Sequence, residues 1–258
     1  MHNHEYKNLL KKYGQQGWWP LINDKTLLCE YHPGDYSYPH NQAQIFEICI
    51  GSVLTQNTSW YPGVVRSLQQ LKLGRPFTKQ ELEVIKQAEI MQASVSGITQ
   101  KQTKDDLLTQ NTNWTNVEKA LLNLKEKNLL NAKEVLKCNI EEIKTAIKPS
   151  GYFNQKTRKL IEFSKFYLNL KKTPARNELL SVWGIGKETA DSILLYAYKV
   201  PTFVIDAYTR KFIEKENLFN SNEEYDKIKG FFEYNLPRDL AIYQEFHALI
   251  VEDAKKSK

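Results

Sequence analysis

The amino-acid sequence predicts an all-α fold, on three observations. Apolar residues recur at helical spacing from residue 42 onward, and the first such stripe contains Ile45, Phe46, Cys49, Ile50 and Val53. Alternation with a period of two is scarce, which argues against an extended sheet. Turn-forming residues gather before residue 42, around Trp18-Trp19-Pro20 and His32-Pro33-Gly34. That first segment is therefore expected to be an irregular arm.

Composition limits the possible classes of protein. A chain of 258 residues, 41% of them hydrophobic, buries a normal core as one domain or two joined lobes. Its net charge of +6 permits a polyanionic partner without requiring one. The cysteines Cys29, Cys49 and Cys138 are too scattered for a disulfide framework or a close-spaced metal set. With a polar start and no membrane-length apolar run, a cytoplasmic protein with no membrane partner is expected.

An internal repeat interrupts the helical pattern. Leu54-Thr55-Gln56-Asn57-Thr58-Ser59-Trp60 returns as Leu108-Thr109-Gln110-Asn111-Thr112-Asn113-Trp114, a shift of 54 positions, and Ser96-Gly97 returns as Ser150-Gly151 at the same shift. We interpret this as a tandem duplication of residues 52–106 onto 107–160. The core is then expected to combine the start of copy one with the end of copy two, and about one repeat length between them is extruded or rearranged.

Residues 178–198 have the pattern of a helix-hairpin-helix. Gly184-Ile185-Gly186 separates two helical runs, and Thr189-Ala190 begins the second. Glycines permit the tight turn and let a phosphate approach the N–H groups that begin the next helix. Gly184, Gly186, Lys187 and Thr189 are therefore candidate DNA contacts. An ordinary glycine-containing turn is the alternative.

Asp206 follows the hairpin after Pro201 and an apolar run, in an Asp-x-x-x-Arg pattern with Arg210. A hairpin followed at this distance by these residues resembles the endonuclease III superfamily of DNA glycosylases. The chain is more similar still to the 3-methyladenine DNA glycosylase III type, through motifs spread along its length. These are Gln16-Gly17-Trp18-Trp19-Pro20, Phe46-Glu47, Leu54-Thr55-Gln56-Asn57-Thr58, Gly151-Tyr152-Phe153-Asn154-Gln155-Lys156 and Phe246-His247-Ala248-Leu249-Ile250-Val251-Glu252.

The resemblance implies a two-lobed helix-hairpin-helix DNA glycosylase fold with an extra duplicated helical segment. Residues 1–42 would be an arm joining the second lobe, 43–198 a helical barrel ending in the hairpin, and 199–258 the second lobe with the catalytic residue. The implied function is a monofunctional DNA glycosylase in base excision repair that hydrolyses the N-glycosidic bond of alkylated purines such as 3-methyladenine. The rivals are a bifunctional glycosylase/lyase and a non-catalytic damaged-DNA binder.

The resemblance also assigns roles to individual residues. Asp206 is the catalytic carboxylate that stabilises positive charge on the sugar, and a helix N-cap role is compatible with this. The base pocket would contain Trp18, Trp19, Pro20, Phe46 and Glu188. The alternatives are that the tryptophans anchor the arm and that Glu188 is a solvated surface charge.

Glu188 occupies the position at which lyase-active relatives carry a nucleophilic lysine, while the neighbouring Lys187 is expected to point elsewhere. A monofunctional enzyme follows. No cysteine occurs after Cys138, so the superfamily's C-terminal iron–sulfur cluster is not expected. No cofactor is required, although the carbonyls of Leu180, Val182 and Ile185 could hold a monovalent cation that bridges to phosphate.

The implied partner is double-stranded DNA containing damaged bases. In the family that the chain resembles, the glutamine of the Leu-Thr-Gln-Asn-Thr motif fills the hole that an extracted base leaves in the duplex. The repeat offers two such residues, Gln56 and Gln110. Gln56 is favoured because the helix before it has the stronger apolar stripe. A monomer associated with the nucleoid is expected, with a domain-swapped dimer as the alternative that the repeat allows.

Overall fold

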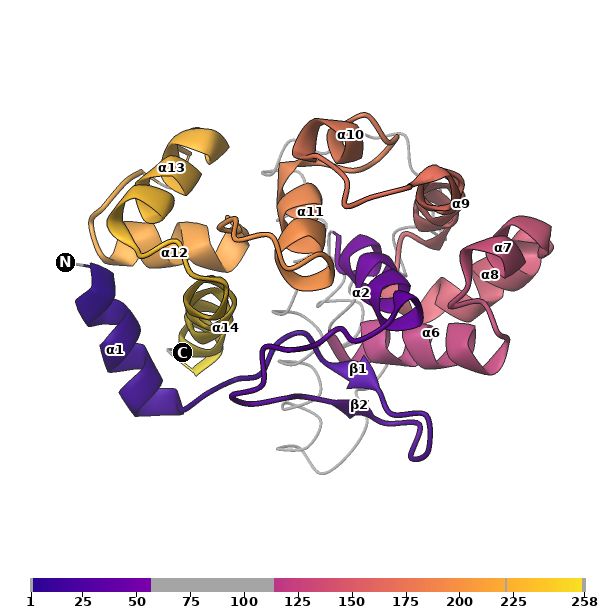
Figure 1. Ribbon diagram of the computed structural model, residues 1–258, viewed down its shortest axis with the longest axis horizontal. Helices are drawn as coiled ribbons and strands as arrows, with labels where there is room; N and C mark the ends of the chain where they lie inside the picture. The colour runs from indigo at the N-terminus through magenta and orange to yellow at the C-terminus, as the bar shows by residue number, and fades with distance from the viewer. Residues whose placement is uncertain (1, 57–113, 221, 257–258) are drawn as a thin grey trace, which may run out of the picture.

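The computed structural model describes residues 2–56, 114–220 and 222–256 (Figure 1). These residues form helices with one short pair of strands, which confirms the all-α prediction. Among them, none of the helices combines the length and apolar character of a membrane span.

Four helices from the two ends of the chain form one group, seen on one side of Figure 1. They are α1 (His2–Tyr13), α12 (Ala207–Lys215), α13 (Tyr225–Asn235) and α14 (Leu240–Lys256). Helix α1 packs on α14 and touches α13, and α12 also packs on α14. The Tyr13 hydroxyl donates to Asp253 Oδ1 at 2.7 Å, and Lys12 Nζ lies 3.2 Å from the same oxygen. The start of the expected irregular arm is therefore a helix held against the end of the chain.

A second group lies on the other side of the view. It contains α2 (Gln42–Leu54), α6 (Trp114–Glu126), α7 (Ala132–Lys137), α8 (Ile140–Ile147), the 3-10 turn η1 (Lys148–Ser150) and α9 (Phe153–Asn169). Asparagine caps begin α2, α7 and α8, where the side chains of Asn41, Asn131 and Asn139 accept backbone N–H groups of the first turn. Helix α2 contacts both α6 and α9, and its residues 46–54 are buried on every face. It is the central helix of this group.

The hairpin helices connect the two groups. They are α10 (Arg176–Leu180) and α11 (Lys187–Ser192), and α11 continues into a π-helical turn, η2 (Ile193–Ala197). The η2 turn packs on α2 of one group and on α14 of the other. A loop, residues 198–206, then leads to α12. Any site at this junction therefore draws on both groups.

The arm between α1 and α2 is irregular apart from strands β1 (Leu21–Ile22) and β2 (Cys29–Glu30). They pair antiparallel, with Leu21 opposite Glu30 and Ile22 opposite Cys29. The Ile22 N–H donates to Glu47 Oε1 of α2 at 2.7 Å, and both residues are buried. This contact fixes the arm just after its tryptophan pair.

Within the described core, copy one contributes the end of α2 and copy two contributes α6 to η1. Lys156, at the start of α9, joins these two ends of the core. Its buried Nζ donates to Leu54 O and to Ser150 O, each at 2.6 Å. Residues 57–113, which include Gln110, lie outside the described residues. The duplication itself stays an interpretation of the sequence.

Candidate active site

The hairpin turn depends on its first glycine. Gly184 has φ of +83°, a left-handed conformation that is costly for side chains with a Cβ. A Cβ there would also lie 2.6 Å from Cγ of Lys159. Gly186 precedes α11 and has open space around it. The turn therefore leaves the backbone at the start of α11 accessible, as the sequence predicted.

Gln56 of copy one lies against this hairpin. Its Nε2 donates to Gly184 O at 3.0 Å and to Thr189 Oγ1 at 2.8 Å, and Lys159 Nζ donates to its Oε1. Three partners hold the half-buried side chain in place. In this conformation Gln56 supports the hairpin, so acting as a wedge in DNA would require these bonds to break.

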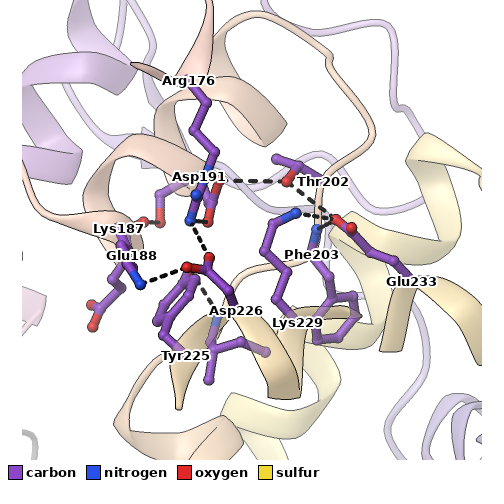
Figure 2. A network of polar contacts seen from close by, with 12 residues as sticks. Arg176, Lys187, Glu188, Asp191, Thr202, Phe203, Tyr225, Asp226, Lys229 and Glu233 are labelled. Atoms are coloured by element: carbon purple, nitrogen blue, oxygen red, sulfur yellow. Dashed lines mark hydrogen bonds and ion pairs between the residues drawn. The ribbon is translucent and has the colours of Figure 1, made fainter. Parts of the chain in front are cut away.

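A network of ion pairs links α10 to α11 within the hairpin and then reaches α13 (Figure 2). Arg176 makes two hydrogen bonds to Asp191, of 2.7 and 2.9 Å, and a third of 2.9 Å to Asp226 Oδ1. Asp191 is fully buried, and this two-point geometry satisfies its carboxylate. Lys187 donates to the other oxygen of Asp226, and Figure 2 shows its side chain turned toward that residue. The prediction that Lys187 points elsewhere is confirmed.

The same network fixes the loop that carries Asp206. Glu233 of α13 accepts from Phe203 N at 2.8 Å and from Thr202 Oγ1 at 3.2 Å, and Lys229 Nζ lies 2.6 Å from it (Figure 2). The Ile205 N–H, one residue before Asp206, lies 3.3 Å from the Tyr225 hydroxyl. The residues just before Asp206 are thereby fixed by side chains of α13.

Asp206 is the N-cap of α12. Its Oδ1 accepts from Thr209 N at 2.7 Å and from Thr209 Oγ1 at 2.9 Å. Its Oδ2 lies 3.4 Å from Nε2 of His247. Burial alone would raise the pKa of Asp206, but the contacts with His247 and Thr209 outweigh it and hold the pKa below its ordinary value. One oxygen thus caps the helix while the other faces His247, so the capping role leaves one oxygen free for a second role.

Glu188, in the first turn of α11, faces the same cavity as Asp206. Water reaches its side chain, while protein atoms crowd its other sides. Desolvation, together with the negative charge of Asp206, raises the pKa of Glu188 to about 7. Asp206 is thus the carboxylate that stays ionised at neutral pH, and Glu188 is the one that takes up a proton more readily.

Three tryptophans form an aromatic wall beside these carboxylates. Trp18 and Trp114 stack at a centroid distance of 6.2 Å, and Trp19 meets Trp114 edge-on at 5.5 Å. Gly51 of α2 makes room for Trp19, since a Cβ there would lie 3.1 Å from its Nε1. Trp114 Nε1 donates to Glu118 Oε1 at 2.7 Å, which fixes the ring.

The wall and the carboxylates enclose a cavity of about 290 Å³. Side chains from the arm, α2, α6, the hairpin, α12 and α14 surround it. They belong to Trp18, Trp19, Thr55, Trp114, Glu188, Ser192, Val204, Asp206, Ala207, Tyr208, His247, Val251 and Lys255. A cavity with these aromatic faces suits a planar ring.

Four of the residues expected at the site meet at this cavity: Asp206, Glu188, Trp18 and Trp19. Pro20 is buried but does not line it. Phe46 does not reach it either, because its ring is buried against Tyr167 at 4.9 Å and Phe163 at 6.4 Å. In the described structure Phe46 is a core residue, and Trp114 provides a third aromatic face.

Sequence reasoning missed Trp114, His247 and Lys255. Lys255 lines the cavity with Nζ 5.5 Å from the Trp18 ring centroid, and burial lowers its pKa. His247 and Lys255 lie on α14, and although His247 belongs to a motif that carries the family resemblance, neither residue was given a role in the site. Trp114 did carry a signal, because it ends the repeated motif.

The carbonyls of Leu180, Val182 and Ile185, for which the sequence suggested a monovalent cation, lie in the hairpin. Val182 O accepts a turn hydrogen bond from Ile185 N at 3.1 Å, and a carbonyl oxygen has a second lone pair for a cation. Within the described residues, no cluster of three or more His, Cys, Asp or Glu side chains has metal-binding geometry.

Comparisons with known proteins agree with this geometry. Residues 106–238 match the family model described as HhH-GPD superfamily base excision DNA repair protein. A Methanocaldococcus jannaschii protein named as a DNA repair glycosylase is 46% identical over 162 residues, covering 58% of this chain and 74% of that protein. Endonuclease III of Thermotoga maritima is 29% identical over 108 residues, covering 41% of this chain and 50% of that protein.

Among solved structures, H. pylori 3-methyladenine DNA glycosylase (MagIII), bound to 1,N6-ethenoadenine, aligns with a TM-score of 0.60. The alignment covers 100% of this chain and 96% of that chain at 24% identity, which establishes a shared fold. Together with the family match, the two-lobed hairpin architecture and the carboxylate-lined cavity, this identifies the chain. It belongs to the HhH-GPD superfamily of base excision DNA repair proteins and is a DNA repair glycosylase.

Proposed function

We propose that this glycosylase is monofunctional and removes alkylated purines such as 3-methyladenine from damaged double-stranded DNA, leaving an abasic site. The observation that carries the proposal is the cavity in which a wall of three tryptophans meets Asp206 and Glu188. Aromatic faces and carboxylates both attract cations, and an alkylated purine is a planar cation. The cavity therefore matches both the shape and the charge of such a base.

Asp206 would act on the sugar. As the N-glycosidic bond breaks, its electron pair leaves with the base and positive charge develops at C1′. An ionised Asp206 stabilises that charge, and it orients or deprotonates the water that adds to C1′. A cationic purine leaves as a neutral base, so no general acid is needed.

The monofunctional part of the proposal rests on where the amines lie. Glu188, not a lysine, lies at the cavity position next to the hairpin, and a carboxylate cannot form a Schiff base. The adjacent Lys187 is bound to Asp226, on the side of α11 shown in Figure 2. Strand cleavage through either position is not expected.

The test is base release from methylated duplex DNA, with products separated by chromatography and strand nicking scored separately. Wild-type protein should release 3-methyladenine without nicking, and Asp206→Asn should lose release while it still binds DNA. Failure of the folded, DNA-binding wild type to release any alkylated purine would reject the proposed substrate class.

One observation favours a second candidate, a bifunctional glycosylase/lyase. Lys255 lines the cavity, and burial lowers the pKa of its amine, which enriches the nucleophilic neutral form. Its amine would attack C1′, displace the base and form an iminium with the opened sugar. Borohydride trapping decides between the two. A covalent DNA adduct in the wild type that disappears in Lys255→Gln would establish this candidate.

DNA would be held by the hairpin, through the backbone before α11 and through Lys187 and Thr189. A phosphate near Gly186 meets open space rather than a side chain. The hairpin carbonyls would add a monovalent cation bridging to that phosphate. If so, replacing potassium by lithium at constant ionic strength should weaken DNA binding, with no effect in a Gly186→Asp variant that blocks the phosphate.

A further inference from the structure

A line of buried polar groups runs behind the cavity and ends on Asp206. Tyr196 of η2 places its hydroxyl 2.7 Å from Nδ1 of His247, a residue of α14. Nε2 of the same ring lies 3.4 Å from Asp206 Oδ2. Tyr196 is 1% exposed and His247 is 4% exposed, so water does not compete for these groups.

The contacts on each side determine where the imidazole proton lies. Within the described residues, Nε2 of His247 is buried and makes no hydrogen bond of regular geometry, and Asp206 Oδ2, at 3.4 Å, is the carboxylate oxygen it faces. An anionic oxygen requires a donor, so a hydrogen on Nε2 is favoured. Nδ1 then accepts from the Tyr196 hydroxyl, whose alternative acceptor, Gln244 O, is farther away at 3.3 Å.

The two oxygens of Asp206 have different surroundings. Thr209 supplies both donors to Oδ1, which fixes the carboxylate at the start of α12. Oδ2 is the oxygen that faces His247, and its orientation decides where the negative charge lies in the cavity. Trp18 packs edge-on against the imidazole at 5.9 Å, so the histidine ring also connects the aromatic wall to the carboxylate.

We propose that His247 is a positioning residue for the glycosylase reaction: its Nε2–H orients Asp206 and keeps it ionised, and Tyr196 fixes the imidazole tautomer. This inference rests on the proposed catalytic role of Asp206. His247 itself touches neither sugar nor base. It acts by presenting a charged, correctly directed oxygen to C1′.

Loss of the Nε2 donor should be visible in the pH dependence. Hydrogen bonding to an ionised carboxylate lowers its pKa, so removal of the donor raises the pKa of Asp206. Base release, which needs the ionised form, should then fall at a higher pH than in wild type. The other titratable groups facing this centre are Glu188 of α11, Tyr196 of η2, Tyr208 of α12 and Lys255 of α14. Two more charges act on these groups, Glu245 of α14 on Tyr196 and Arg210 of α12 on Glu188.

Because Glu188 itself titrates near neutral pH and also lines the cavity, each variant is made in two backgrounds, wild type and Glu188→Gln, and is compared with its own background. Single-turnover base release from methylated duplex DNA is measured from pH 5 to 9 for His247→Leu, His247→Gln and Tyr196→Phe. Leucine has no donor, whereas the glutamine amide replaces the Nε2–H. DNA affinity and melting temperature are measured for each variant.

His247→Leu should slow release on the order of 10²-fold and move the acidic midpoint up by about one pH unit. His247→Gln should recover most of the rate and return the midpoint toward that of the background. Tyr196→Phe should show a smaller loss in the same direction. DNA affinity should change little in all three, because Tyr196 and His247 are buried and neither is among the candidate DNA contacts around residues 184–189.

Two results would overturn the inference. One is a midpoint that is the same in His247→Leu as in the background; the other is equal impairment in the leucine and glutamine variants. If His247→Leu does not fold, an unaltered rate and midpoint in folded Tyr196→Phe would overturn it as well. Asp206→Asn, assayed in parallel, separates the two proposals: full activity there would reject the catalytic assignment instead.

Discussion

Glu47→Gln should stabilise the protein at alkaline pH and leave it nearly unchanged at acidic pH. Glu47 is 5% exposed on α2, where its Oε1 accepts the Ile22 N–H at 2.7 Å. Burial raises the pKa of this carboxyl from 4.5 to about 7, although the Ile22 N–H opposes that shift. A glutamine keeps the acceptor oxygen and removes the charge.

The direction of the pH effect follows from the protonation of Glu47 in the folded and the unfolded chain. Below pH 4.5 the carboxyl is protonated in both folded and unfolded chains, and no penalty exists. As pH rises toward 7, the unfolded chain ionises first and stability falls, because the folded state holds its proton longer. Above pH 7 the loss is complete, at about 3 kcal/mol of unfolding free energy.

Glu47→Gln should therefore exceed wild type by about 2–3 kcal/mol at pH 8, which is about 4–12 °C in melting temperature for a chain of this size. At pH 4.5 the two proteins should melt within about 2 °C of each other. Urea unfolding at both pH values measures the difference. Glu141→Gln makes the same change on an exposed side chain and should have little effect at either pH.

The reasoning would be refuted if the stability difference between Glu47→Gln and wild type did not depend on pH. Base release gives a second readout, because Glu47 fixes the arm that follows the tryptophan pair. Glu47→Gln should retain activity, whereas Glu47→Ala leaves the buried Ile22 N–H without a partner and should lower both stability and activity, the former by about 1–3 kcal/mol.

Three further predictions concern the walls and supports of the cavity. Gly51→Ala places a Cβ about 3.1 Å from Trp19 Nε1 and should slow base release about tenfold with little change in melting temperature; an unaltered rate would show that Trp19 moves freely. Gln56→Ala removes two hydrogen bonds to the hairpin and should weaken DNA binding about fivefold, measured by fluorescence anisotropy, whereas equal weakening in Gln110→Ala would contradict this assignment. Trp114→Ala should raise KM for methylated DNA, and Trp60→Ala, the same change in the other copy, should not.

The sequence was sufficient for those parts of the fold that local patterns encode. Helical periodicity predicted the helices, and Gly184 predicted the hairpin through a backbone angle that favours glycine. Asp206 was predicted both as a helix cap and as a site residue, and it caps α12 and lines the cavity. Both roles follow from one short stretch of chain.

Other parts of the site depend on contacts between distant segments. His247 lies on a helix whose buried face reads as ordinary core, and only packing brings it to Asp206. The structure does not place Phe46 at the cavity, because residues 46–54 of α2 are all buried and the Phe46 ring packs on Phe163 of α9. The repeat raised a further choice, since two glutamines have the same sequence context. The structure places Gln56 at the hairpin, while the family match includes Gln110.

Two carboxylates that face one cavity repel each other when both are ionised. The surroundings of Asp206 and Glu188 differ, so the two groups do not ionise equally readily. Asp206 receives two donors from Thr209 and faces His247, whereas no donor within the described residues reaches the Glu188 carboxylate. Asp206 therefore holds the permanent charge, and Glu188 gains or loses its proton near neutral pH. A positive charge developing between them favours the ionised form of Glu188 as well. Under the proposed mechanism, the cavity would then become more negative as positive charge develops on the sugar, and such a difference between transition state and ground state is what accelerates a reaction.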